Sequence, residues 1–133
     1  MKQLLFLSIL FFALILTSTT LAQELRVVSL DKDNSLFASS SRIVLKPGDK
    51  LQFKAVDGDF AIYIVDAVRY LKIGEADLKI RINSATNPLS DVYDVMGDNE
   101  MIELTYAIYC ISTYNWPDAP PKIIIQSNSS DEE

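Results

Sequence analysis

Apolar and polar residues alternate along most of the chain, and this two-residue period predicts β-strands rather than helices. In residues 50–56, for example, Leu51, Phe53 and Ala55 fall on one face and polar residues separate them. Residues 60–65 form a continuous apolar run, which is typical of a strand that is buried on both faces. The predicted strands are residues 25–30, 42–45, 50–56, 60–65, 78–82, 92–96, 101–110 and 122–126.

Turn signals separate these segments. Pro47-Gly48 and Asp57-Gly58-Asp59 suit tight turns, residues 67–75 suit a helical turn or an irregular crossover, and residues 83–90 suit a loop. About seven to eight short strands without a long amphipathic helix predict an all-β fold, a two-sheet antiparallel Greek-key sandwich. An immunoglobulin-like sandwich is the alternative, although the chain has one cysteine and so lacks the paired cysteines between the sheets.

The N-terminal pattern differs from the rest. Lys2 precedes an apolar stretch over residues 4–16, and small residues at Thr20-Leu21-Ala22 suit cleavage after Ala22. The apolar stretch is shorter than the roughly 20 residues that cross a bilayer. We therefore expect residues 1–22 to be a signal peptide, the protein to be secreted or periplasmic, and no stable membrane span to remain after cleavage.

The remaining chain is the size of a single domain. Residues 23–126 are predicted to form one sandwich, and residues 127–133 an acidic, disordered tail. Once Lys2 is removed, 11 basic and 18 acidic residues remain, so the net charge is −7. This charge disfavours nucleic acid as a partner, because the phosphate backbone attracts basic surfaces.

Candidate catalytic chemistry is sparse. The sequence contains no histidine, no phosphate-binding glycine loop and no nucleophilic serine motif, so it predicts a protein that is not an enzyme. Cys110 is the lone cysteine and cannot form an internal disulfide. It is either a small buried hydrophobe or an exposed, reactive thiol.

Three segments together resemble the cupredoxin family, the β-sandwich proteins related to plastocyanin and azurin. Residues 41–53, with their Lys-Pro-Gly-Asp turn, are similar to the family's early strand pair, residues 106–110 (Tyr-Ala-Ile-Tyr-Cys) to its cysteine-bearing strand, and residues 121–126 to its closing strand. The resemblance implies a cupredoxin fold. It also implies where the copper ligands of such proteins would fall.

The resemblance places the family's cysteine ligand on Cys110, its two histidines near Ile62 and Thr113, and its weak axial methionine near Asp118. A type 1 copper centre needs two imidazoles beside the thiolate. A chain without histidine cannot supply them, so we expect no copper, no other metal and no cofactor.

The loop that follows Cys110 is rich in aromatic residues and proline. Tyr114 and Trp116 are candidates for binding a protein or glycan partner, and the alternative is that Trp116 folds back as a lid over the end of the sandwich. Acidic loops at residues 31–35, 57–59 and 97–100 suit either weak calcium binding or ordinary solvated turns.

Two functional hypotheses follow from the sequence. The first is an exported, non-catalytic cupredoxin-like module that lost its copper and binds a protein or glycan partner or serves a structural role. The alternative is a redox or metal-handling protein that uses Cys110 as a thiol or ligand.

Overall fold

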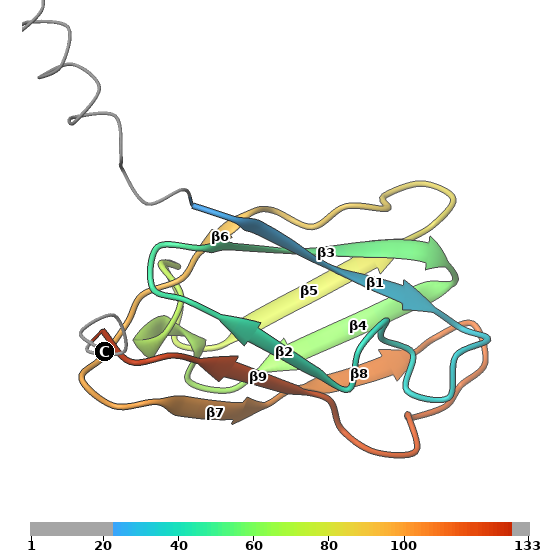
Figure 1. The fold of residues 1–133 in the computed structure, drawn as a ribbon. Coiled ribbons are helices and arrows are strands. Elements are labelled where there is room, and N and C mark those ends of the chain that lie inside the picture. Colours follow the sequence, from blue (N-terminus) through green and yellow to red (C-terminus); the bar gives the residue numbers. More distant parts are fainter. Residues whose placement is uncertain (1–22, 129–133) are drawn as a thin grey trace, which may run out of the picture.

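The computed structural model describes residues 23–128, so the expected signal peptide and residues 129–133 of the expected tail lie outside the described residues. Within this range the structure has nine strands and one short 3₁₀ turn (Figure 1). The elements are β1 (Leu25–Asp31), β2 (Arg42–Leu45), β3 (Lys50–Asp57), β4 (Asp59–Ile64), η1 (Ala67–Arg69), β5 (Leu78–Asn83), β6 (Tyr93–Asp94), β7 (Ile102–Thr105), β8 (Ala107–Cys110) and β9 (Lys122–Ile125).

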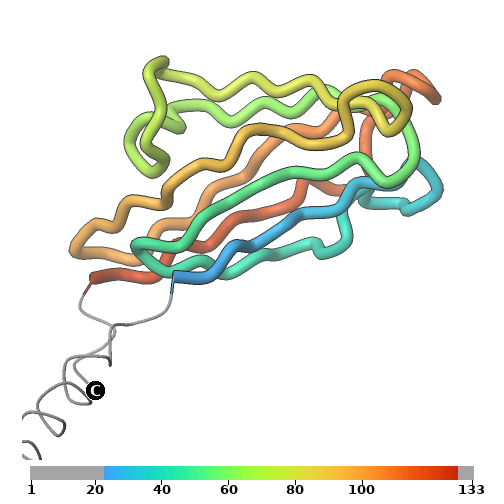
Figure 2. The backbone as a smooth tube through the Cα atoms, turned by 90° about the horizontal axis from the view of Figure 1, so that it is seen from above, coloured from blue at the N-terminus to red at the C-terminus, as the bar shows by residue number. Residues whose placement is uncertain are grey.

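The strands form three small sheets, with the orders β1-β3-β6, β2-β9-β7 and β5-β4-β8. Figures 1 and 2 show β4 and β5 in one layer and β1 and β3 in the other. Side chains of alternate residues point into the space between the layers and form one core. The predicted all-β sandwich is therefore confirmed.

The sequence predicted a wholly antiparallel sandwich, and the structure differs from that prediction. β1 pairs in parallel with β3, and β2 pairs in parallel with β9. β2 belongs to a different sheet from β1 and β3, so the chain leaves the first sheet after β1 and returns with β3 in the original direction. Period-2 alternation places residues on faces but carries no information about strand direction, and the prediction was wrong on this point.

The predicted long strand over residues 101–110 is divided at Tyr106. β7 pairs with β9, whereas β8 pairs with β4 in another sheet. The amide of Tyr106 donates to the carbonyl oxygen of Pro121 (3.2 Å), and its buried ring packs against Phe53 with ring centroids 5.8 Å apart. The inward face continues unbroken across the division, which is why the alternation alone did not reveal it.

The turn between β2 and β3 is fixed by a buried carboxylate. Asp49 accepts hydrogen bonds from the amides of Lys46 (2.9 Å) and Glu24 (3.3 Å), and Gly48 adopts φ +91°. A glycine accommodates this conformation without the penalty that a side chain brings. In the part of the chain that the structure describes, no helix has the length and apolarity to cross a membrane.

Candidate functional site

Strand β8 ends at Cys110, and two backbone hydrogen bonds close the loop that follows it. The Cys110 amide donates a hydrogen bond to the Asn115 carbonyl oxygen (2.9 Å), and the Asn115 amide donates one to the Cys110 carbonyl oxygen (3.1 Å). The Cys110 side chain lies in the core and is fully buried. Of the two roles that the sequence left open, its environment is that of a small buried hydrophobe.

Phe60, rather than Ile62, lies opposite Cys110. The register of β4 and β8 pairs Phe60 with Cys110 and pairs Ile62 with Ile108, two residues further along. All four side chains are buried, and the Phe60 ring contacts that of Phe37 with centroids 6.1 Å apart. The space beside the thiol is therefore occupied by hydrocarbon.

The other two positions matched to copper ligands lie outside the core. Thr113 and Asp118 are exposed on the loop after β8, and the Asp118 amide donates to the carbonyl oxygen of Ser35 (3.2 Å). A buried thiol, a buried isoleucine and two exposed oxygen-bearing side chains do not make the imidazole and thiolate set that holds type 1 copper. The residues present therefore do not fit that metal centre.

The two aromatic candidates of this loop are strongly exposed. Tyr114 is 82% exposed and has φ +52°, in the left-handed region that tyrosine seldom occupies. Trp116 is 61% exposed and its ring lies against that of Tyr109, with centroids 4.8 Å apart. The arrangement in which Trp116 covers the end of the sandwich is not the one in the structure.

Trp116 borders a shallow groove on the outer face of the sheet formed by β5, β4 and β8. The groove has a volume of about 390 Å³ and a mainly apolar lining. We call it the β4 groove, after its central strand. Its outward-facing residues are Ala61, Tyr63, Lys79, Arg81, Ala107, Tyr109 and Trp116.

Two cross-strand rows explain the hollow. In the first row Ala61 lies between Arg81 and Tyr109, and in the second Tyr63 lies between Lys79 and Ala107. Adjacent side chains on one face of a sheet stand about 5 Å apart, so a small alanine between larger neighbours leaves a depression. The outer face of β4 is therefore open, and the expectation that residues 60–65 are buried on both faces was wrong.

Polar contacts fix the residues at the rim of the groove. The Tyr63 hydroxyl donates to Asp77 Oδ2 (2.5 Å), which lowers the pKa of the Asp77 carboxyl and raises the pKa of Tyr63. The Lys79 ammonium lies 5.9 Å from the centre of the Tyr63 ring. Arg81 Nη2 donates to Asp59 Oδ2 (3.2 Å), so both basic side chains are held over the sheet face.

The sequence suggested Trp116 but not its partners in the groove. Tyr63 and Tyr109 occupy outward-facing positions of strands whose inward residues are apolar. Tyrosine at such positions is the sequence signal from which the groove could have been predicted. Their proximity to Trp116 depends on the pairing of β4 with β8, which no local pattern contains.

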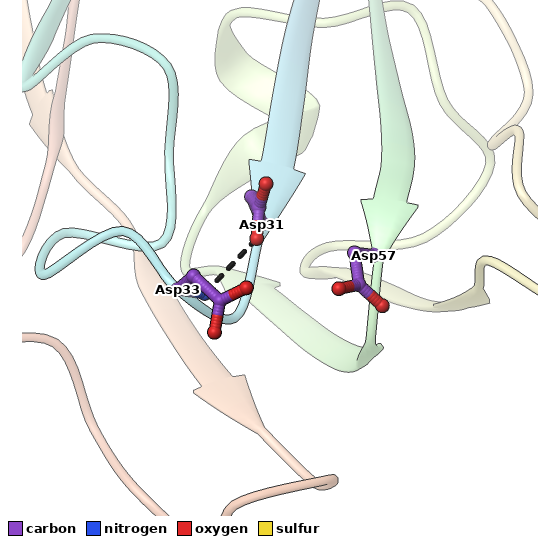
Figure 3. Close-up of side chains that lie close together, drawn as sticks. All are labelled: Asp31, Asp33 and Asp57. Atoms are coloured by element: carbon purple, nitrogen blue, oxygen red, sulfur yellow. Dashed lines mark hydrogen bonds between the residues drawn. The ribbon is translucent and has the colours of Figure 1, made fainter.

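Three carboxylates gather at one end of the sandwich, as Figure 3 shows. Asp31, Asp33 and Asp57 place one oxygen each within 4.8 Å of one another, and the Asp33 amide donates to Asp31 Oδ1 (2.9 Å). Lys32 Nζ lies 3.7 Å from Asp57 Oδ1 and offsets part of the negative charge. The cluster brings together two of the acidic loops that the sequence singled out.

No protein-family model matches the sequence, and the search of curated proteins found no significant match. Solved structures do match. A reduced Cu(I) form of an amicyanin variant aligns over 83% of this chain and 88% of its own, with a TM-score of 0.50 and 15% sequence identity. A second reduced amicyanin variant aligns over 80% and 86%, with a TM-score of 0.52 and 17% identity.

The fold is cupredoxin-like. This confirms the resemblance carried by residues 41–53, 106–110 and 121–126. Because the identity to amicyanin is only 15% and 17%, the likeness establishes a divergent cupredoxin-like fold and not a shared activity.

Proposed function

We propose that this protein is an exported, non-catalytic cupredoxin-like module without type 1 copper, which binds a protein or glycan partner through Trp116 and the β4 groove. The observation that carries the proposal is the exposed Trp116 ring, which packs at a tilt against the Tyr109 ring at the border of an apolar hollow. Large exposed apolar surfaces in concave settings are typical of binding sites.

The chemistry of the chain supports the loss of copper. The full sequence has no histidine, and Cys110 lies opposite the ring of Phe60 in the core. Soft thiolate and imidazole ligands give type 1 sites their affinity for copper, and here only the sulfur is present. The N-terminal sequence pattern at residues 1–22 supports export.

The burial of Cys110 weighs against the alternative of a redox or metal-handling protein. A thiol becomes reactive through exposure and a neighbouring positive charge, and Cys110 is fully buried. We therefore expect the thiol of the native protein to resist labelling and to react only after unfolding.

A copper titration tests the first half of the proposal. We expect that adding Cu(II), or Cu(I) under anaerobic conditions, produces no intense visible absorption band and no rise in melting temperature. A rise in melting temperature that is lost in Cys110→Ser would overturn the proposed loss of copper and restore the metal-handling alternative.

Selection from displayed peptides and a glycan array tests the second half. Ligands should bind the wild type and fail to bind Trp116→Ala. Met101→Ala is the matched control, because Met101 is 63% exposed and Trp116 is 61% exposed, while Met101 is not among the residues that line the groove. If the ligands recovered bind Trp116→Ala as well as the wild type, this surface is not the binding site.

A further inference from the structure

We propose that the ligand of the β4 groove is an oligosaccharide that carries carboxylate groups, such as a chain of uronic acid residues. This inference rests on the proposed function and names the class of ligand for the same surface. The volume of about 390 Å³ falls within the range of about 300–1,000 Å³ that is usual for sites of small molecules.

Backbone bonding in the groove argues against an extended peptide. The floor is β4, which pairs with β5 over residues 59–64 on one side and with β8 over residues 60–63 on the other. Its backbone groups are engaged in the two ladders, whereas a peptide that docks as an added strand needs an unpaired edge. Recognition in the groove must therefore come from side chains.

The aromatic side chains suit a sugar ring. Trp116 and Tyr109 contact each other at the border of the groove, and Tyr63 is on the same face of β4. The C–H face of a pyranose ring is apolar and can lie flat on an aromatic ring, while its hydroxyls remain free at the rim. The hydrogen bond from Tyr63 to Asp77 fixes the Tyr63 ring before a ligand arrives.

The basic side chains at the groove favour acidic sugars over neutral ones. The charged residues that line the groove are Lys79 and Arg81, both basic, and each has one acidic neighbour: Asp59 pairs with Arg81, and Asp77 lies near Lys79. Arg81 uses Nη2 to bind Asp59, yet its side chain is 70% exposed, so further guanidinium donors are free to reach a ligand. A carboxylate is the group that these two side chains bind most favourably.

A fluorescence titration tests this directly, because Trp116 is the sole tryptophan of the chain. The probes are trigalacturonate and its fully methyl-esterified form, which keeps the rings and removes the charge. We expect a saturable change in Trp116 emission with trigalacturonate, weakened by added NaCl, and affinity for the ester that is lower by about tenfold or more.

Substitutions of groove residues test which side chains contact the ligand. Arg81→Gln and Lys79→Gln should each weaken trigalacturonate binding by about tenfold, and Ala61→Leu should abolish it by filling the hollow. Lys54→Gln, which removes an exposed lysine from β3 in the other layer, should leave binding unchanged. Unchanged melting temperatures and circular dichroism spectra will show that the variants are folded.

Three outcomes overturn the inference: unchanged Trp116 emission, equal affinity for acid and ester, or equal weakening by Lys54→Gln. If displayed peptides that require Trp116 are recovered while trigalacturonate does not bind, the proposed function stands and the carboxylated glycan is refuted. Copper uptake through Cys110 contradicts the proposed function independently of either result.

Discussion

Phe60→Ala tests whether the space beside Cys110 is closed by packing. Phe60 is fully buried, lies opposite Cys110 in the β4–β8 ladder and contacts the Phe37 ring. Removing the ring leaves a void lined by these neighbours, since alanine cannot reach them. The substitution therefore removes buried apolar area and creates a cavity at the same time.

The expected cost is large compared with the stability of a domain of this size. Substitution of a buried phenylalanine by alanine costs about 3–5 kcal/mol, while a domain of this length is stabilised by about 5–15 kcal/mol. For a denaturant slope near 2 kcal/mol per molar urea, the unfolding midpoint should fall by about 2 M.

Urea unfolding followed by circular dichroism measures this shift, and thiol labelling in native buffer measures access to Cys110. The variant should be both less stable and more rapidly labelled than the wild type. Tyr63→Ala is the matched control on the same strand, because Tyr63 is 37% exposed on the outer face. That substitution should cost about 0.5–1 kcal/mol. A loss below about 1 kcal/mol in Phe60→Ala, with labelling unchanged, would refute the packing described here.

Three further substitutions test other parts of the fold. Burial raises the pKa of Tyr106, so the folded state holds the phenolic proton more tightly. The corresponding contribution to the free energy of unfolding is complete below the pKa near 10 that tyrosine has in the unfolded chain. It is lost as pH rises above that value, by up to about 1.4 kcal/mol per pH unit. Tyr106→Phe should flatten that loss in urea melts between pH 9 and 11, and parallel pH profiles would contradict the assignment. Gly58→Ala should lower the melting temperature, at a cost of about 1–3 kcal/mol in the free energy of unfolding. The reason is that Gly58 has φ +122° and an added Cβ would meet the Phe60 ring at 3.0 Å. Gly74→Ala is the control and should be close to neutral, because nothing lies within 4 Å of its added Cβ. Asp49→Ala should cost about 1–3 kcal/mol by leaving the amides of Lys46 and Glu24 without their shared acceptor. An unchanged urea midpoint would show that the carboxylate does not hold the turn.

The positions of the strands were largely readable from the sequence. The predicted strand at residues 42–45 matches β2, and most of the other predictions differ from the structure by one or two residues at their ends. The exceptions are informative. The predicted strand at 92–96 shrinks to Tyr93–Asp94, and that at 101–110 is interrupted at Tyr106, because ladder pairing with distant strands sets where a strand ends.

The candidate site was only partly readable. The absence of histidine is a property of composition, so the mismatch with a copper site needed no coordinates. The neighbour of Cys110 is Phe60 rather than Ile62 because of the register between β4 and β8. Register is a long-range property. A shift of two residues keeps every side chain on the same face, so the alternation pattern cannot detect it.

The sequence by itself determined that this chain forms β-strands with a continuous inward face, and that it lacks the imidazoles of type 1 copper. The tertiary structure decided which strands are neighbours. These pairings bury Cys110 against Phe60 and leave Trp116 exposed beside Tyr109. They also leave a groove above Ala61, with Lys79 and Arg81 on its border. The physical reason is that faces follow from local alternation, whereas neighbours follow from pairing between distant segments, such as Phe60 with Cys110 and Arg42 with Lys122.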